Sequence, residues 1–206
     1  MNVLYFHGFA SSPASGKITA LRPLLAPHGI ELDTPDLNAP SFEELDFEAI
    51  VARALDTAAR NPPGAIVGSS LGAIIALEVA RRGLEMPLVL IAPAVGIAER
   101  WIEKLPAGDP IMVFNHARNA DAPIHRAFFE QMSRVDADRL PPRQRVIAIM
   151  GRRDESVPFA RVEQTWNHWE AAGLAPGSKL IVIDEGDHGL VAWSPIIADA
   201  IREAVA

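Results

Sequence analysis

Short apolar runs alternate along the chain with longer segments in which apolar residues recur every three or four positions. The short runs predict strands buried on both faces, and the longer segments predict amphipathic helices. Such alternation is typical of a parallel sheet with helices on both faces, which makes the fold class α/β. Six strands are expected, at Asn2–Phe6, Glu31–Thr34, Ala65–Gly68, Leu88–Ile91, Arg145–Met150 and Lys179–Ile183.

The same periodicity predicts four helices between and after these strands. The first is expected to begin at the capping box Ser41-Phe42-Glu43-Glu44 and to run to about Arg60. In this box Ser41 accepts a hydrogen bond from the first turn, and Glu44 reaches back to the start of the helix. The other three helices are expected over Leu71–Arg82, Phe159–Ala172 and Pro195–Val205.

The segment 96–142 interrupts this alternation. It contains four large aromatic residues and several prolines, and it is too long for a plain connection between two strands. We interpret it as a helical insertion over one end of the sheet, either a lid or two ordinary surface helices. The whole chain, 1–206, is expected to form a single domain around one sheet.

A candidate nucleophile lies between the third strand and the next helix. Gly68-Ser69-Ser70-Leu71-Gly72 matches the Gly-x-Ser-x-Gly nucleophile elbow, with Ser70 at its centre. The elbow is a sharp strand-to-helix turn, so it needs small residues on both sides of the serine. Ser69 lacks the symmetrical glycines and is expected to orient a neighbour or to contact substrate.

A serine hydroxyl needs a base within hydrogen-bonding reach and a carboxylate that holds this base in the correct tautomer. His188 lies in the loop after the last strand, at the sheet edge where Ser70 must also lie. It is therefore the candidate base. We expect structural or merely exposed roles for the other five histidines, His7, His28, His116, His125 and His168.

Asp154 is the candidate acid, because it follows the fifth strand and so also lies at the carboxyl edge of the sheet. Glu155 is its chief rival, and Asp184 or Asp187 could cap the final loop instead. The chain order Ser, Asp, His is that of hydrolases with a nucleophile elbow.

Donors for a developing oxyanion are expected in the turn after the first strand, His7-Gly8-Phe9-Ala10-Ser11-Ser12-Pro13. The candidates are the backbone N–H groups of Phe9 and of Leu71, the residue after the nucleophile. Gly8 lets the chain turn closely, and His7 is expected to bond across the loop. A strand order of 2-1-3-4-5-6 brings this turn and Ser70 together at the switch point of the sheet.

Composition and the absence of certain motifs exclude several classes of partner and cofactor. The 206 residues carry a net charge of −7 without a basic cluster, so nucleic acid is not an expected partner. The absence of cysteine excludes disulfides, a thiol nucleophile and thiolate metal sites. No apolar run is long enough for a membrane span and no leader is visible, so we expect a cytoplasmic protein. The segment around Gly16-Lys17 lacks the phosphate-loop pattern, and no dinucleotide fingerprint is found.

These motifs together resemble the α/β-hydrolase family. The opening His-Gly-Phe-x-Ser-Ser-Pro with Gly-Ser-Ser-Leu-Gly is similar to small bacterial YqiA-type esterases, and the likeness extends over essentially the whole chain. It implies an ester-hydrolysing serine enzyme without metal or organic cofactor, with Ser70 as nucleophile, His188 as base and Asp154 as orienting acid. The sequence starts at the oxyanion strand, so we expect a minimal, three-layer, all-parallel sheet of six strands.

Other functions on the same fold stay open. A thioesterase or acyltransferase would use the same three residues, and a ligand-binding protein without turnover would need none of them. The expected partner is a small-molecule ester with a short acyl group, in a crevice lined by Phe9, the aromatic residues of the insertion (Trp101, Phe114, Phe128 and Phe129) and Trp193. The oligomeric state is not predicted.

Overall fold

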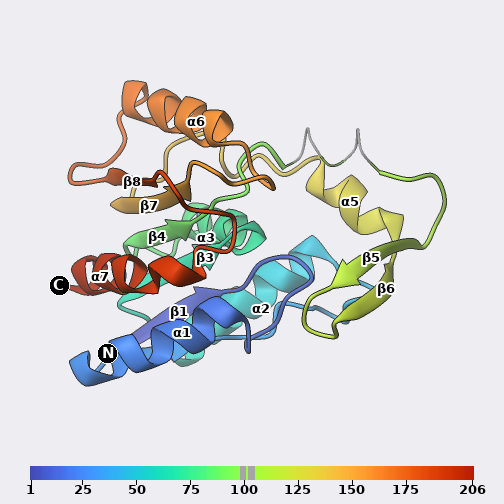
Figure 1. The fold of residues 1–206 in the computed structure, drawn as a ribbon, viewed down its shortest axis with the longest axis horizontal. Helices are drawn as coiled ribbons and strands as arrows, with labels where there is room; N and C mark the ends of the chain where they lie inside the picture. Colours follow the sequence, from blue (N-terminus) through green and yellow to red (C-terminus); the bar gives the residue numbers. More distant parts are fainter. Residues whose placement is uncertain (98–100, 102–104) are drawn as a thin grey trace.

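Six parallel strands form the central sheet in this computed structural model, which describes residues 1–97, 101 and 105–206 (Figure 1). Their order is β2-β1-β3-β4-β7-β8, and every neighbouring pair is parallel. The expected order and the all-parallel sheet are confirmed, with boundaries within one residue of those expected. The strands are β1 (Asn2–Phe6), β2 (Glu31–Asp33), β3 (Ala65–Ser69), β4 (Leu88–Ile91), β7 (Val146–Gly151) and β8 (Lys179–Ile183).

Helices cover the sheet on both sides. Helices α1 and α7 pack against each other on one face, and α2 and α3 pack together on the other (Figure 1). This arrangement is the one expected when right-handed crossovers run in opposite directions from the switch point of the sheet. The elements are α1 (Gly16–Leu25), η1 (Ala26–His28), α2 (Phe47–Arg60), α3 (Leu71–Arg81), α6 (Phe159–Ala171), η2 (Val191–Trp193) and α7 (Ser194–Val205).

Helix α1 is an element that the sequence pattern did not reveal. It has only ten residues and contains Pro23, which weakens its helical signal. Its buried residues Ile18, Leu21 and Leu25 are nevertheless spaced three and four apart and face the core. No helix in the described ranges has both the length and the apolar character needed to cross a membrane.

The core is centred on the middle strands and α3. Strands β1, β3 and β4 consist almost entirely of buried residues, and ten of the eleven residues of α3 are buried. One of the ten is Glu78, whose carboxylate accepts hydrogen bonds from Arg81 and Arg82. Arg82 also binds Glu48, so this charged group connects α3 to α2 at the edge of the core.

The start of α2 differs from the capping box that the sequence suggested. Asp46 is the N-cap, and its Oδ1 accepts from the Ala49 N–H at 2.8 Å. Ser41 Oγ accepts from the Glu44 N–H at 3.2 Å, but this bond closes a separate turn before the helix. The two capping residues lie five positions apart in the sequence, and only the second, Asp46, begins α2.

The insertion is mixed rather than helical throughout. Strands β5 (Ile111–Asn115) and β6 (Ala120–Ile124) form an antiparallel hairpin, followed by helix α5 (Arg126–Met132). The run Ile-Met-Val-Phe favours a strand, and Asn119 has φ 52° in the turn, a conformation that asparagine tolerates. Residues 98–100 and 102–104, which the helical expectation also covered, lie outside the described residues. The role of the insertion as a lid stays a prediction.

The insertion lies beyond the carboxyl ends of the strands (Figure 1) and is bound to the segment before α2. Gln131 in α5 accepts from the Phe47 N–H at 2.9 Å and donates to Asp46 Oδ2 at 2.7 Å. The His125 N–H donates to the Glu43 carbonyl at 3.1 Å. Asp46 therefore both caps α2 and fixes the insertion.

Replacing this cap tests which residue begins α2. Asp46→Ala is expected to lower the free energy of unfolding by about 1–2 kcal/mol, because an N-cap acceptor and a partner of Gln131 are lost. Urea unfolding of Asp46→Ala and the control Ser41→Ala measures this difference. A larger loss in Ser41→Ala than in Asp46→Ala would contradict the assignment of the cap.

Candidate active site

Ser70 occupies a sharp turn between β3 and α3. Its backbone has φ 55° and ψ −118°, outside the regions that residues with a side chain usually adopt. The Ser70 N–H donates to the Ile91 carbonyl at 2.9 Å, and the Ser70 carbonyl accepts from the Ala73 N–H at 3.0 Å. These bonds fix the turn to β4 and α3, so its hydroxyl is held at the carboxyl edge of the sheet.

The two glycines of the motif allow this turn by permitting close backbone contacts. A Cβ on Gly68 would lie 2.3 Å from the Gly72 carbonyl oxygen, and a Cβ on Gly72 would lie 2.1 Å from the Phe6 carbonyl oxygen. Both distances are far inside van der Waals contact with backbone atoms. The strand, the helix and β1 can therefore pack together only if both positions lack a side chain.

His188 and Ser70 meet across the edge of the sheet. His188 lies in the loop between β8 and η2, and its Nε2 is 3.0 Å from Ser70 Oγ. Its Nδ1 is 2.7 Å from Asp154 Oδ2. The structure thus brings the three sequence-selected residues into one hydrogen-bonded chain, although 118 residues separate the serine from the histidine.

Asp154 is the buried end of this chain. Its side chain is 0% exposed, and its Oδ1 accepts from the backbone N–H groups of Ser156 and Val157 at 2.8 and 2.7 Å. The neighbouring Glu155 is exposed. The two other carboxylates considered have different partners, since Asp187 accepts from the Leu190 N–H and Asp184 binds Arg152. Asp154 is therefore the carboxylate in contact with His188.

The turn after β1 lies against Ser70. A Cβ on Gly8 would be 3.3 Å from Ser70 Cβ and 3.9 Å from Ser70 Oγ, so the backbone passes directly beside the hydroxyl. Phe9 follows in this turn, and Leu71 is the first residue of α3, where a backbone N–H has no helical acceptor. Both residues line the same cavity as Ser70. Their use as oxyanion donors stays a prediction.

His7 has a bonding role in this loop. Its Nε2 accepts from the Leu37 N–H at 3.0 Å, so Nδ1 carries the proton and donates to the Gly8 carbonyl at 2.9 Å. Burial lowers the pKa of His7, and the Gly8 carbonyl and Asp36 oppose this effect. The neutral ring therefore holds the turn after β1 to the segment after β2.

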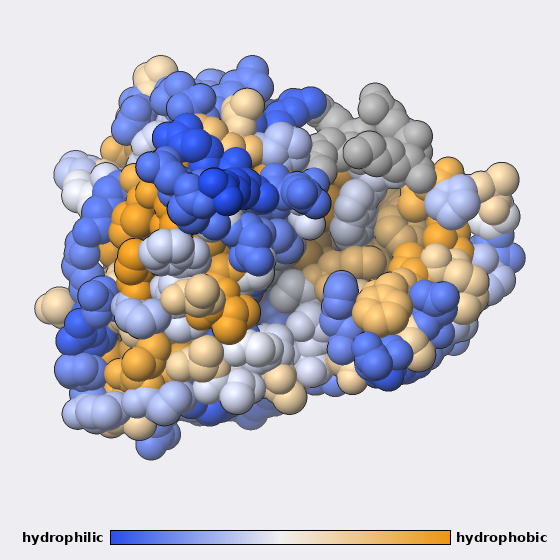
Figure 2. All heavy atoms as spheres, viewed as in Figure 1, coloured by the Kyte–Doolittle hydropathy of each residue, from blue (hydrophilic) through white to orange (hydrophobic). Residues whose placement is uncertain are grey.

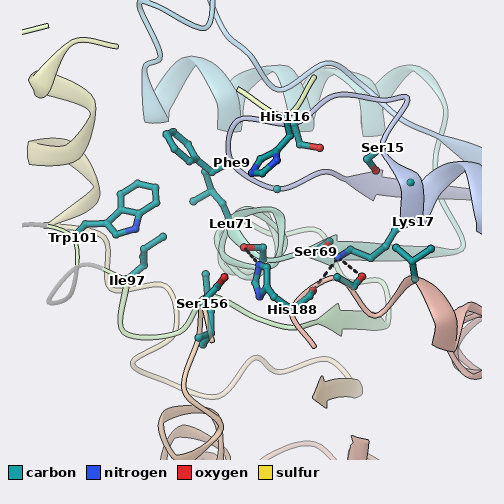
Figure 3. Close-up of a pocket in the computed structure, with 18 residues that line it drawn as sticks. Phe9, Ser15, Lys17, Ser69, Leu71, Ile97, Trp101, His116, Ser156 and His188 are labelled. Atoms are coloured by element: carbon teal, nitrogen blue, oxygen red, sulfur yellow. Dashed lines mark hydrogen bonds between the residues drawn. The ribbon is translucent and has the colours of Figure 1, made fainter. Parts of the chain in front are cut away.

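A cavity of about 410 Å³ opens beside these residues, and Figure 2 shows the molecule hollowed between its main body and the insertion. One side is apolar, with Phe9, Ile97 and Trp101, and the other carries Ser15 and Lys17 (Figure 3). The rings of Phe9 and Trp101 meet at 5.0 Å between centroids, edge to face. The cavity that Ser70 lines thus has two chemically different walls.

Sequence reasoning missed some residues of the cavity. Lys17 follows no phosphate-loop pattern, and the sequence predicts a structural or exposed role for His116, yet both residues line the cavity. His116 reaches it because its N–H donates to the Ala10 carbonyl at 2.8 Å. Of the aromatic residues expected in the crevice, Phe9 and Trp101 line the cavity. The expectation is wrong for the others, since Phe128 and Phe129 are buried, Phe114 is exposed and Trp193 packs against the core. The spacing of residues along the sequence does not indicate these contacts, because they join segments that are far apart in the chain.

Among the described residues, no group of three or more His, Asp or Glu side chains is arranged to hold a metal ion.

The model of the uncharacterised protein family UPF0227 matches residues 2–202. A comparison with curated protein sequences finds no match.

Solved structures share the fold at low sequence identity. Est1E from Butyrivibrio proteoclasticus with bound ferulic acid has a TM-score of 0.79 at 16% identity, covering 99% of this chain and 89% of that one. The esterase domain of a Rhodothermus marinus protein has a TM-score of 0.71 at 19% identity, covering 100% and 88%. Mouse alpha/beta hydrolase domain-containing protein 10 has a TM-score of 0.75 at 18% identity, covering 98% and 88%. The chain therefore has the α/β-hydrolase fold.

The glycine contacts lead to a test of the turn. Gly72→Ala is expected to destabilise the protein by about 1–3 kcal/mol or more and to displace Ser70, because the new methyl group collides with the β1 backbone. Thermal and urea unfolding measure the loss. Gly16→Ala is the control, since a Cβ there meets only Val191 at 3.8 Å. Equal stability of Gly72→Ala and wild type would contradict the close packing described.

Proposed function

We propose that this chain, which belongs to the UPF0227 family, is a serine hydrolase that cleaves carboxylic esters. The observation that carries the proposal is the hydrogen-bonded chain from Ser70 Oγ through His188 to the buried carboxylate of Asp154. A hydroxyl, an imidazole and a carboxylate in this order are the groups that nucleophilic acyl transfer requires.

In the proposed first half-reaction, Ser70 Oγ attacks the carbonyl carbon of the ester while His188 Nε2 takes the hydroxyl proton. Asp154 stays ionised and stabilises the imidazolium, since its carboxylate contacts the opposite ring nitrogen. Collapse of the tetrahedral intermediate breaks the bond to the alcohol oxygen. The proton on His188 then passes to this oxygen, and the alcohol leaves an acyl group on Ser70.

In the second half-reaction, water replaces the alcohol. His188 removes a proton from the water, whose oxygen attacks the acyl carbon, and the same proton returns to Ser70 Oγ as the carboxylic acid leaves. In both steps the oxyanion forms at the carbonyl oxygen. The backbone N–H groups of Phe9 and Leu71 are the proposed donors, because both flank Ser70 at the wall of the cavity.

The cavity supports a small substrate. A space of about 410 Å³ suits a short acyl group or a single aromatic ring better than a long chain. The apolar wall of Phe9, Ile97 and Trp101 favours an uncharged acyl group. Est1E, which has the same fold, binds ferulic acid, so an aryl ester belongs in the substrate series beside acetyl and butyryl esters.

Covalent capture tests the nucleophile without a choice of substrate. Incubation with a fluorophosphonate probe is expected to add one probe mass to the wild-type protein, because an activated serine attacks phosphorus as it does a carbonyl. The measurement is intact mass. Ser70→Ala is expected to remain unlabelled, whereas Ser69→Ala is expected to be labelled normally. Labelling that persists in Ser70→Ala would overturn the assignment of the nucleophile.

A substitution of the acid tests the role of the buried carboxylate. Asp154→Asn is expected to lower kcat for an ester found in the series by about 10⁴-fold, because the amide stabilises the wrong tautomer of His188 and cannot stabilise its charge. Glu155→Gln is the matched control and is expected to keep wild-type turnover. Circular dichroism checks that both variants are folded. Near-normal turnover of Asp154→Asn would refute the assignment.

A further inference from the structure

Lys17 extends from the first helix to the loop that carries His188. Its Nζ donates to the Gly189 carbonyl at 2.7 Å and to the His188 carbonyl at 3.2 Å (Figure 3). The lysine is near the N-terminus of α1, 171 residues before His188. One ammonium group thus binds two successive carbonyls, one of them that of the candidate base itself.

Besides the ring contacts of His188 with Asp154 and Ser70, the loop has other attachments, but they lie elsewhere along its backbone. Before His188, the Arg153 N–H donates to the Gly186 carbonyl at 2.9 Å, which fixes the loop to the turn after β7. After Gly189, the Leu190 N–H donates to Asp187 Oδ1 at 2.8 Å and closes the loop on itself. Lys17 reaches the loop from α1 and binds the backbone between these two points.

The attachment of α1 to this region makes the lysine's position well defined. Ile18, the next residue, is 1% exposed in the core, and α1 packs against both α7 and η2. The aliphatic part of Lys17 is therefore held at its base by buried helix packing. Its charged end is constrained by two charge-assisted hydrogen bonds, which are about twice as strong as neutral ones.

We propose that Lys17 is a positioning residue for the hydrolytic reaction, holding the backbone of His188 and Gly189 so that His188 Nε2 stays in contact with Ser70 Oγ. This inference rests on the proposed function, because it concerns the efficiency of the same three residues. Lys17 is not itself proposed to contact the reacting atoms. Its action depends on its charge, since a neutral amine donates weaker hydrogen bonds than an ammonium group.

The surroundings of Lys17 place its loss of charge in a measurable pH range. Burial lowers the pKa of Lys17 to about 8, and the carboxylates of Asp187 and Asp154 oppose part of this lowering. Among the described residues, these two carboxylates are the charged groups that act on Lys17, and the imidazoles of His188 and His116 line the same cavity. Lys17 therefore carries its proton below pH 8 and loses it above this value, so its contribution decreases as the pH rises.

The test compares the rates of fluorophosphonate labelling of wild type and Lys17→Met between pH 7 and 9.5. At pH 7, the variant's kinact is expected to be about 10- to 100-fold lower, because misplacing a catalytic group by about 1 Å costs this much, while KI stays nearly unchanged. At pH 9.5, the ratio of wild type to variant is expected to shrink to about threefold, since Lys17 is then neutral in the wild type. A merely structural lysine would give a ratio independent of pH.

Two further variants make the comparison specific. Lys17→Arg keeps its charge throughout this range and is expected to retain more activity than Lys17→Met, without the decline above pH 8. Lys179→Met is the matched control, because Lys179 binds Glu203 at the surface and is expected to leave labelling unchanged. Thermal unfolding checks that each variant is folded, and Lys17→Gln replaces Lys17→Met in the series if the latter does not fold.

The outcomes separate this inference from the proposed function. Absence of Ser70-dependent labelling in the folded wild type would overturn the proposed function and this inference with it. Normal labelling of the wild type combined with an unaffected Lys17→Met, or with a ratio that does not change with pH, would overturn the inference alone. A decline above pH 8 that persists unchanged in Lys17→Arg would also overturn it.

Discussion

The close packing of β3, α3 and β1 around Ser70 is the constraint on which the rest of the site depends. A residue with a side chain at φ 55° costs on the order of 1–3 kcal/mol unless its surroundings hold it there. Here these surroundings belong to the buried core: strands β1, β3 and β4 and a helix with ten buried residues. The fully buried core therefore stabilises an unfavourable turn, and the turn exposes one hydroxyl at the sheet edge.

The parallel sheet brings the other groups to this hydroxyl. Because all six strands of the central sheet run in the same direction, the segments after β1, β7 and β8 all begin at the edge where Ser70 lies. These segments carry Phe9, Asp154 and His188, and strand order reverses between β1 and β3, which leaves room for a ligand there. The loops are then fixed by backbone hydrogen bonds, such as those from the Ser156 and Val157 N–H groups to Asp154. The regular sheet thus brings these residues to the same edge, and local hydrogen bonds then set the positions of their side chains.

The sequence predicted the parts of this arrangement that depend on local pattern. Gly68-Ser69-Ser70-Leu71-Gly72 could be located because a sharp turn restricts residue types at fixed spacing, and Asp154 and His188 could be selected because they follow buried strands. The start of α2 at Asp46 could not, since Ser41 offers an equally good local cap and the contact with Gln131 decides between them. The β5–β6 hairpin was not predicted, because prolines and charged residues interrupt the strand pattern in this segment, although its first strand is rich in residues that favour strands.

Lys17 and the insertion illustrate why long-range contacts escape such reasoning. A lysine near a helix start has no local feature that indicates two carbonyls 171 and 172 residues away. The apolar wall has a similar origin: Phe9 lies in the turn after β1, but its ring stacks on Phe128 at 6.0 Å and meets Trp101 at 5.0 Å, both from the insertion. The backbone of the same turn also accepts a hydrogen bond from His116 of the hairpin, through Ala10. The insertion therefore forms part of one wall of the cavity and also binds the turn that carries Phe9, so the shape of this wall and the position of the Phe9 N–H depend on the same contacts.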